Sequence, residues 1–343
     1  MRDLRDPRGR GATLALALLL VAALLLAAGP GSGPGAAPVL GGAGRSSATA
    51  SGDAPSTAAA SSSAAAASFR FMSAAQVSAA GAGALTFSVP PWVWLEPRSP
   101  SAPPAPPTPA EEAATEAALA NSSNFKAQSG EDRFALERFF GRRRGGVILE
   151  SGALDGITFS TSWLFERALG WRAVHIEASP RMYADLVRNR PGALNVHAAL
   201  CGTPQTLHLA YLDRTDAAGG LWEFMSPRHR EEFWPGTDVN SLAMVACMPL
   251  VPLLALFGIA HVDLWVLDVE GAELEVLRAT DFSRLSVDVI VVETIGFDRA
   301  QDARVVAYIE AQGFVNFGAE KHNTWLVSPE AAERIAQTSN GKD

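Results

Sequence analysis

Residues 262–271 read Val-Asp-Leu-Trp-Val-Leu-Asp-Val-Glu-Gly, and this stretch decides the fold class. The run Val262–Leu267 is mostly apolar and has the length of a strand buried on both faces, which is typical of a parallel sheet. Asp268 and Glu270 follow at its carboxyl end. Two carboxylates at the end of so apolar a strand do not contribute to the stability of a sheet, so they indicate a functional cleft.

Strands and helices alternate on both sides of this stretch. Further strands are predicted over Val147–Glu150, Arg172–Glu177, Leu194–Ala199, Leu207–Leu212 and Val287–Glu293, and a closing hairpin over Phe314–Phe317 and Thr324–Val327. Helices are predicted up to Leu169, from Pro180, and over Pro252–Phe257, Ala272–Ala279 and Arg299–Gln312. Repeated strand–helix–strand units predict an α/β fold, in which a mostly parallel sheet carries helices on both faces and ends in an antiparallel hairpin.

The composition divides the chain into parts. Ala, Ser, Gly and Pro dominate the first 120 residues, whereas the long aliphatic and aromatic residues gather beyond them. Residues 29–120 are therefore predicted to be a disordered stem, because they offer too little apolar surface to offset the entropy of ordering. A single domain is expected over 121–330, followed by a tail over 331–343.

An apolar segment lies near the N-terminus. Residues 12–28 are uncharged and follow an Arg-rich stretch, residues 1–11. A helix of this length measures about 26 Å, the short end of what spans a bilayer. The pattern predicts that residues 12–28 are a signal-anchor, with residues 1–11 in the cytoplasm and the domain in the lumen of the secretory pathway. The short segment suits a thin membrane, such as that of the Golgi. Cleavage as a signal peptide, followed by secretion, stays open.

Charge and cysteine content narrow the partners and the compartment. A formal net charge of −8 disfavours nucleic acid as a partner. The basic run Arg142–Arg144 is interpreted as a solvated turn before a strand. Cys201 and Cys247 either stay reduced as small buried residues or, in an oxidising lumen, form one disulfide. Their spacing matches no zinc motif, and no metal is predicted.

Two more strand ends carry unusual residues. The stretch Glu150-Ser-Gly-Ala-Leu-Asp-Gly156 places glycines at 152 and 156, where a tight turn lets the backbone approach a ligand. Its spacing lacks the Gly-x-Gly-x-x-Gly order that suits a dinucleotide pyrophosphate. Glu177 ends the next strand, where an acid can accept hydrogen bonds from the hydroxyls of an adenosine ribose. A surface Glu that caps the following helix is the alternative.

The chain resembles the FkbM-type methyltransferase family in the order and spacing of its motifs. Three blocks carry the resemblance: Glu150–Gly156, Ile176–Pro180 and Leu267–Leu277. Shorter matching pieces are Gln128–Asp132, Asn189-Arg190 and Val292-Glu293. One departure is Ala178, where the family pattern suggests proline.

The resemblance implies a Rossmann-like class I methyltransferase sheet that uses S-adenosylmethionine, commonly on sugar or other hydroxyl groups. The implied cofactor-binding residues are Glu150, Gly152, Asp155, Gly156 and Glu177. The turn around Gly152 would face the methionine part and Glu177 the ribose. Asp268 and Glu270 would line the cleft between cofactor and acceptor.

Transfer of a methyl group to a hydroxyl is assisted by a base that takes the hydroxyl proton. The strand-end carboxylates Asp268, Glu270 and Glu293 are the candidates, with Asp268 first, although it could equally hold the amino group of the cofactor. His197 and His208 are weaker candidates, because a lone histidine is more often structural. No histidine joins the acidic pair in sequence, so metal ligation is not expected there.

A lumenal domain of this family suggests methylation of sugar hydroxyls on glycans. One alternative is a nicotinamide-dependent oxidoreductase on a similar sheet, disfavoured by the glycine spacing and by the absence of a Tyr-x-x-x-Lys pair. Another is a non-catalytic, membrane-tethered binding module on a methyltransferase scaffold. The intact acids Glu177, Asp268 and Glu270 argue against this second alternative.

Overall fold

The computed structural model describes residues 86–88, 107–211, 218–294 and 298–340. The apolar segment 12–28 and most of the predicted stem lie outside these residues. Among the described residues, no helix has both the length and the apolar character needed to cross a bilayer.

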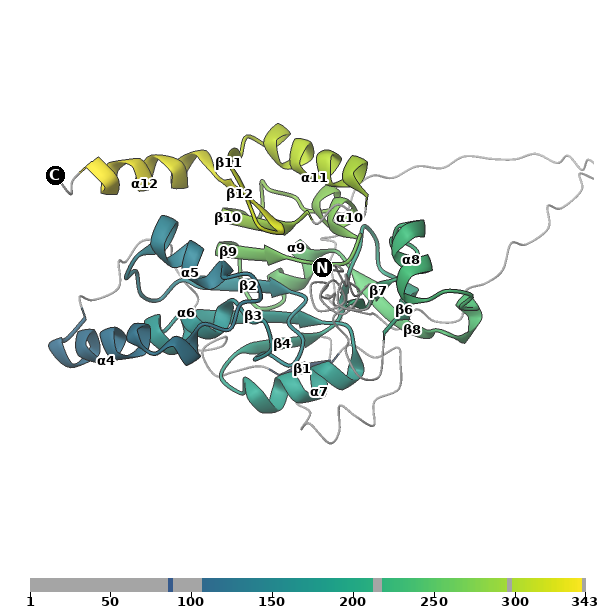
Figure 1. Cartoon of the computed structure of the whole chain (residues 1–343), viewed down its shortest axis with the longest axis horizontal. Coiled ribbons are helices and arrows are strands. Elements are labelled where there is room, and N and C mark those ends of the chain that lie inside the picture. The colour runs from purple at the N-terminus through teal and green to yellow at the C-terminus, as the bar shows by residue number, and fades with distance from the viewer. Residues whose placement is uncertain (1–85, 89–106, 212–217, 295–297, 341–343) are drawn as a thin grey trace, which may run out of the picture. The chain divides into compact units, whose positions relative to one another are not determined.

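An eight-stranded sheet forms the centre of the domain (Figure 1). In sheet order its strands are β1 (Thr86–Ser88), β4 (Leu194–His197), β3 (Arg172–Glu177), β2 (Val147–Ser151), β9 (His261–Leu267), β10 (Ser286–Glu293), β12 (Asn323–Val327) and β11 (Val315–Glu320). The five strands from β4 to β10 are parallel, and β1, β12 and β11 are antiparallel to their neighbours. The order of the parallel strands reverses between β2 and β9, which makes this position the topological switch point where such sheets bind ligands.

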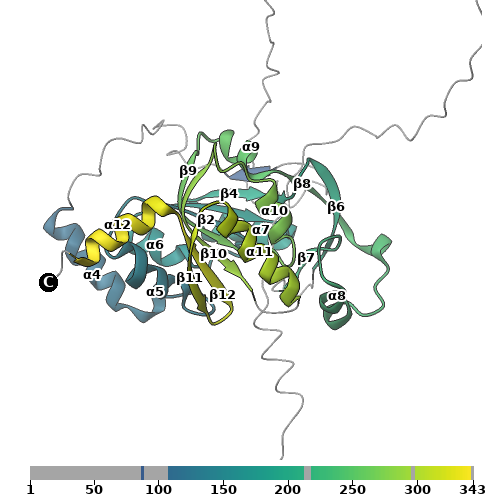
Figure 2. The ribbon, with the colours of Figure 1, turned by 90° about the horizontal axis from the view of Figure 1, so that it is seen from above.

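Helices cover both faces of this sheet (Figure 2). They are α4 (Pro109–Ala120), α5 (Glu131–Ala135), α6 (Ser162–Leu169), α7 (Pro180–Asn189), α9 (Leu250–Ala255), α10 (Glu273–Arg278), α11 (Arg299–Ala311) and α12 (Pro329–Asn340). Leu253, Val276 and Ile309 bring α9, α10 and α11 to one apolar core. Phe165 and Ala331 bring α6 and α12 to the core on the other face. The predicted α/β fold, with its mostly parallel sheet and C-terminal hairpin, is confirmed.

A second, four-stranded sheet was not predicted. It contains β5 (Ala199–Leu200), β8 (Ala243–Met248), β6 (Gln205–Ala210) and β7 (Gly220–Leu221), and the helix α8 (Pro227–Phe233) lies between β7 and β8 in the chain. Cys201 and Cys247 form a disulfide beside the pairing of β5 with β8, with their Cα atoms 5.7 Å apart. Of the two states left open for these cysteines, the structure has the disulfide.

The prediction of disorder over 29–120 is wrong at two described places. Phe87 in β1 is buried and packs edge-on against Phe257, at a centroid distance of 5.2 Å. The helix α4 begins at a capping box, in which Thr108 and Glu111 satisfy each other's backbone N–H groups. Alanine has the highest helix propensity, so an Ala-rich segment with such a cap folds once it has a surface to pack on.

The C-terminal region and the basic run also differ from expectation. The helix α12 occupies most of the predicted tail 331–343, and Ala331 is buried in the core. The basic run is not a simple solvated turn. Arg143 forms ion pairs with Asp263 and Asp288, and Arg142 with Glu116.

Candidate active site

A pocket opens at the switch point between β2 and β9. The two strands end together there, since Ser151 is paired with Leu267 and the Asp268 N–H donates to the Ser151 carbonyl at 3.2 Å. We call it the switch-point pocket. It is lined by Gln128, Ser129, Glu131, Glu150, Gly152, Ala153, Leu154, Thr158, Phe159, Ser160, Thr161, Val266, Asp268, Glu293, His322 and Asn323.

The turn after β2 is held in an unusual backbone conformation. Gly152 has a φ of 99°, a region that favours glycine, and Leu154 has a φ of 48°. Glu177 stabilises this turn, because its two carboxylate oxygens accept the N–H groups of Leu154 and Ser179, each at 2.8 Å. Glu177 is only 1% exposed, at the end of β3. It therefore lies behind the turn and is not part of the pocket lining.

Glu150 is the centre of a buried hydrogen-bond network. Its carboxylate accepts the Ser162 N–H at 2.6 Å and the Ser160 hydroxyl at 3.1 Å. Burial raises the pKa of Glu150, and the nearby Arg190 guanidinium opposes this shift. By holding Ser160 and Ser162, Glu150 fixes the segment that forms one wall of the pocket.

Asp155 and Gly156 do not line the switch-point pocket. The carboxylate of Asp155 accepts the N–H groups of Ile157 and Thr158 within its own turn, at 2.9 and 2.7 Å. Gly156 has a φ of 77°, and a Cβ there would lie 2.6 Å from the side chains of Arg190 and Leu186. Close packing against α7 accounts for this glycine, whereas the sequence suggested approach to a ligand.

Asp268, Glu270 and Glu293 converge at the carboxyl ends of β9 and β10. We call these residues the carboxylate trio. One oxygen from each lies within 4.8 Å of the others. Burial and the neighbouring carboxylates raise the pKa of all three groups well above the usual range. Glu293 hydrogen-bonds to Asp268, which requires a proton on one of the two side chains.

Two oxygens of the trio have no partner. Asp268 Oδ1 and Glu270 Oε1 are buried without a hydrogen bond. Among the described residues, no Lys or Arg forms an ion pair with the trio. Glu270 also has a φ of 49°, a strained conformation for a residue with a side chain. Unpaired polar atoms and backbone strain in one place are features of functional sites.

Glu273 and His229 support the trio from outside. The Glu273 carboxylate accepts the N–H groups of Val269 and Gly271, at 3.0 and 3.1 Å, and so fixes the turn that carries Glu270. His229 Nε2 donates to the Ala218 carbonyl at 3.1 Å, which leaves Nδ1 at 3.4 Å from Glu270 Oε2. Burial lowers the pKa of His229 to about 4, so this imidazole is neutral near pH 7.

A second pocket lies on the other side of the trio. We call it the α8 pocket, and it is lined by Ser226, His229, Glu270, Gly271, Glu273, Glu293, Asp298, Gln301 and Asp302. Glu293 borders both pockets, Asp268 borders the switch-point pocket and Glu270 the α8 pocket. The carboxylate trio therefore separates two binding spaces.

Glu131 and His229 were not predicted as site residues from the sequence. Glu131 lines the switch-point pocket and accepts hydrogen bonds from Ser129 N–H and from Asn323, at 2.9 and 2.6 Å. It belongs to the matching piece Gln128–Asp132, which was a usable signal. Nothing in the sequence predicted His229 as a site residue, because it lies 41 positions before Glu270 and the two are brought together only in the folded structure. The weaker candidates His197 and His208 line neither pocket.

Comparison with known proteins identifies the domain. Residues 150–315 match the family model described as the methyltransferase FkbM domain. This domain belongs to the FkbM methyltransferase family. It is therefore an S-adenosylmethionine-dependent methyltransferase, as the motifs predicted.

No curated protein matches the sequence. Among solved structures, fibrillarin from Aeropyrum pernix with natively bound S-adenosyl-L-methionine is 15% identical, with a TM-score of 0.31, over 54% of this chain and 68% of that one. Precorrin-6y C5,15-methyltransferase from Geobacter metallireducens is 15% identical, with a TM-score of 0.32, over 58% and 86%.

The switch-point pocket of this methyltransferase domain fits the cofactor chemically. S-adenosylmethionine carries a sulfonium and an ammonium group, which are both cationic. Four carboxylates line the pocket, from Glu131, Glu150, Asp268 and Glu293, and its lining contains no Lys or Arg. Such a lining suits a cationic ligand and disfavours the pyrophosphate of a nicotinamide cofactor.

Proposed function

We propose that this methyltransferase transfers a methyl group to a sugar hydroxyl of a glycan in the secretory pathway. The carboxylate trio between two pockets carries the proposal. One pocket would hold the cofactor and the other the acceptor, so that the reacting atoms meet at acidic groups able to accept a proton.

The cofactor is proposed to bind in the switch-point pocket. The turn around Gly152 would face its methionine part, with Glu150 fixing the pocket wall. Glu177 is proposed to act at the ribose through the turn that its carboxylate holds at Leu154, because Leu154 lines the pocket and Glu177 itself does not. Asp155 and Gly156 would contribute through the shape of the same turn.

The chemistry requires little covalent help from the protein. When bound, S-adenosylmethionine supplies an electrophilic methyl group on a sulfonium leaving group. The pocket arrangement would hold the acceptor oxygen in line with that group, which is the main contribution to rate. A sugar hydroxyl has a high pKa, so a carboxylate that receives its proton during transfer assists the reaction. Asp268 is proposed for this role, with Glu270 and Glu293 beside it.

The α8 pocket favours an acceptor rich in hydroxyl groups. Carboxylates from Glu270, Glu273, Glu293, Asp298 and Asp302 line it, together with the amide of Gln301. Carboxylate oxygens accept hydrogen bonds, and sugar hydroxyls donate them. An anionic acceptor, such as a phosphorylated one, would be repelled by the same lining.

The compartment is proposed from the cysteines and the N-terminus. The Cys201–Cys247 disulfide supports an oxidising environment, because such bonds persist in the secretory pathway and are rare in the cytosol. Residues 12–28 would hold the enzyme in the Golgi membrane, with the catalytic domain in the lumen. Secretion after cleavage of this segment is the alternative.

The test is methyl transfer by the purified full chain. The enzyme is incubated with isotopically labelled S-adenosylmethionine and a panel of neutral, sulfated and phosphorylated glycans, and label is located by mass spectrometry. We expect the wild type to place label on a hydroxyl of neutral glycans. The variant Asp268→Asn should lose this labelling, and the control variant Asp281→Asn, at an exposed position, should keep it. Absence of label from every glycan, or label confined to the sulfated and phosphorylated ones, would overturn the assignment to a neutral sugar hydroxyl.

A further inference from the structure

We propose that Asp268, Glu270 and Glu293 together bind a hard divalent cation, such as Mg²⁺, Mn²⁺ or Ca²⁺, between the two pockets. The site is built from three carboxylates on two adjacent strand ends, whose nearest oxygens lie within 4.8 Å of one another. Oxygens that share a Mg²⁺ or Ca²⁺ ion, at about 2.0–2.6 Å from it, lie no more than about 4–5 Å apart. The spacing therefore admits one ion in contact with all three residues.

The unpartnered oxygens point independently to a ligand. Glu270 has a side chain only 2% exposed, and its Oε1 accepts no hydrogen bond. Asp268 Oδ1 is also buried and without a partner. A buried hydrogen-bond acceptor that has no partner lowers the free energy of unfolding by about 1–3 kcal/mol, and by more when the acceptor is charged. A cation would satisfy both atoms at once.

Within the described part of the chain, no cationic side chain is placed to balance the trio. None of its carboxylates forms an ion pair with Lys or Arg. The one basic side chain near Glu270 is His229, whose Nδ1 lies 3.4 Å from Glu270 Oε2 while its Nε2 donates to the Ala218 carbonyl. A divalent ion would compensate the charge of the three carboxylates.

The position of the ion would suit the reaction. Asp268 and Glu293 border the switch-point pocket, and Glu270 and Glu293 border the α8 pocket. A hard cation here could also coordinate an acceptor oxygen and make its hydroxyl more acidic. This last step rests on the proposed function, whereas binding of the ion does not.

A second acidic group provides the matched control. His261, Asp263 and Asp288 also bring three ligand atoms within 4.8 Å, at the opposite end of the same strands. However, Arg143 pairs with Asp263 and Arg334 with Asp288. These two guanidinium groups already occupy the positions that a cation would take, so we place no ion there.

The experiment is titration of Mn²⁺ into the full chain after EDTA treatment and its removal, with free Mn²⁺ measured by electron paramagnetic resonance. We expect one site with a Kd between about 10⁻⁵ and 10⁻³ M. Glu293→Gln should weaken it at least about tenfold, and His261→Gln should leave it unchanged. Thermal unfolding should shift upward with Mn²⁺ in the wild type and not in Glu293→Gln.

Absence of Mn²⁺ binding up to several millimolar, or binding that is lost in His261→Gln and kept in Glu293→Gln, would overturn the inference. S-adenosylmethionine binding by the same proteins, measured in EDTA, separates this failure from that of the proposed function. Cofactor binding without Mn²⁺ binding would refute only the cation site. Mn²⁺ binding without cofactor binding would refute only the proposed function.

Discussion

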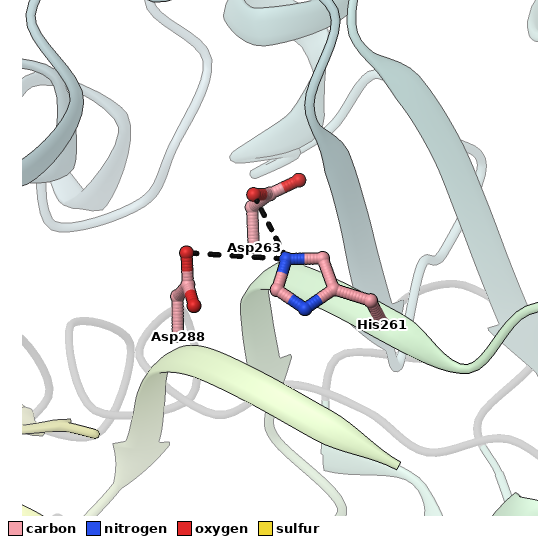
Figure 3. Close-up of side chains that lie close together, drawn as sticks. All are labelled: His261, Asp263 and Asp288. Carbon is pink, nitrogen blue, oxygen red and sulfur yellow. Dashed lines mark hydrogen bonds and ion pairs between the residues drawn. The ribbon is translucent and has the colours of Figure 1, made fainter. Parts of the chain in front are cut away.

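Two acidic clusters occupy opposite ends of β9 and β10, and they differ in how their charge is balanced. The amino-end cluster consists of His261 and Asp263 on β9 and Asp288 on β10 (Figure 3). His261 Nε2 lies 3.1 Å from Asp263 and 3.9 Å from Asp288. The carboxylate trio lies at the other end of the same strands. Among the residues that the structure describes, His229 is the one basic side chain within ion-pair distance of it, and its imidazole is neutral near pH 7.

Charge pairing has different consequences at the two ends. Burial raises the pKa of Asp263, but the hydrogen bond from His261 and the charge of Arg143 outweigh it, so the pKa lies below its usual value. This buried carboxylate therefore stays ionised and accepts the Val147 N–H at 2.6 Å. It ties β2 to β9 and is structural. In the trio the pKa values rise instead, because carboxylates face one another in a buried site. An unpaired cluster of this kind reduces stability, which is typical of a site kept for function.

The largest expected effect is on catalysis by the trio. Asp268→Asn should lower kcat/KM for methyl transfer by about 10²–10⁴-fold, because it removes the proposed proton acceptor. The measurement is the initial rate of label transfer to the glycan found as acceptor. Asp281→Asn, on an exposed turn, is the control. A rate within threefold of the wild type would show that Asp268 does not take part in the chemistry.

The next effect is on the stability of the amino-end cluster. Asp263→Ala should lower the free energy of unfolding by about 2–4 kcal/mol, since Arg143 and the Val147 N–H would lose their shared acceptor. Urea unfolding measures the change. The refolded variant should bind S-adenosylmethionine as the wild type does. A change below about 0.5 kcal/mol would contradict the structural role given to Asp263.

A smaller effect of opposite sign is expected in the trio. Glu293→Gln should raise the free energy of unfolding in EDTA by about 1 kcal/mol, because it removes one of three mutually repelling carboxylates. The same urea titration applies, with Asp281→Asn again as the control. If the variant is instead destabilised by a similar amount, the trio contributes to stability and the contrast between the two ends fails.

The smallest effect concerns the pH dependence of stability at the amino end. Hydrogen bonding to Asp263 raises the pKa of His261 above its usual value. The protonated His261 therefore contributes fully to the free energy of unfolding below about pH 6.5, and this contribution is lost as the pH rises through the raised pKa. Because the side chain is 43% exposed, we expect less than about 1 kcal/mol. His261→Gln should abolish this part of the pH profile, and an unchanged profile would contradict the assignment.

The sequence predicts the features that depend on local pattern. Aliphatic runs located the central strands, and the spacing of Asp268 and Glu270 after such a run predicted that they share a cleft. Glu293 followed from the same logic on the next strand. The parallel sheet then brings these side chains together, since the carboxyl ends of its strands lie at one edge.

The features that depend on distant contacts could not be predicted in this way. The pairing of Asp263 with Arg143 joins residues 120 positions apart, so Arg142–Arg144 resembled a solvated turn. The structure gives Gly156 a packing role and Glu177 a turn-holding role because of their neighbours Arg190 and Leu154. The second sheet was missed because two of its strands, β5 and β7, have only two residues each.

The central claim is that the switch-point pocket binds S-adenosylmethionine, and calorimetric titration of the cofactor into the purified full chain tests it most directly. We expect a Kd in the micromolar range, near −8 kcal/mol. Glu177→Gln should weaken binding at least about tenfold. Asp185→Asn, on α7 and outside the lining of both pockets, should not, and thermal unfolding confirms that both variants fold. Absence of binding by the folded wild-type chain would contradict the account.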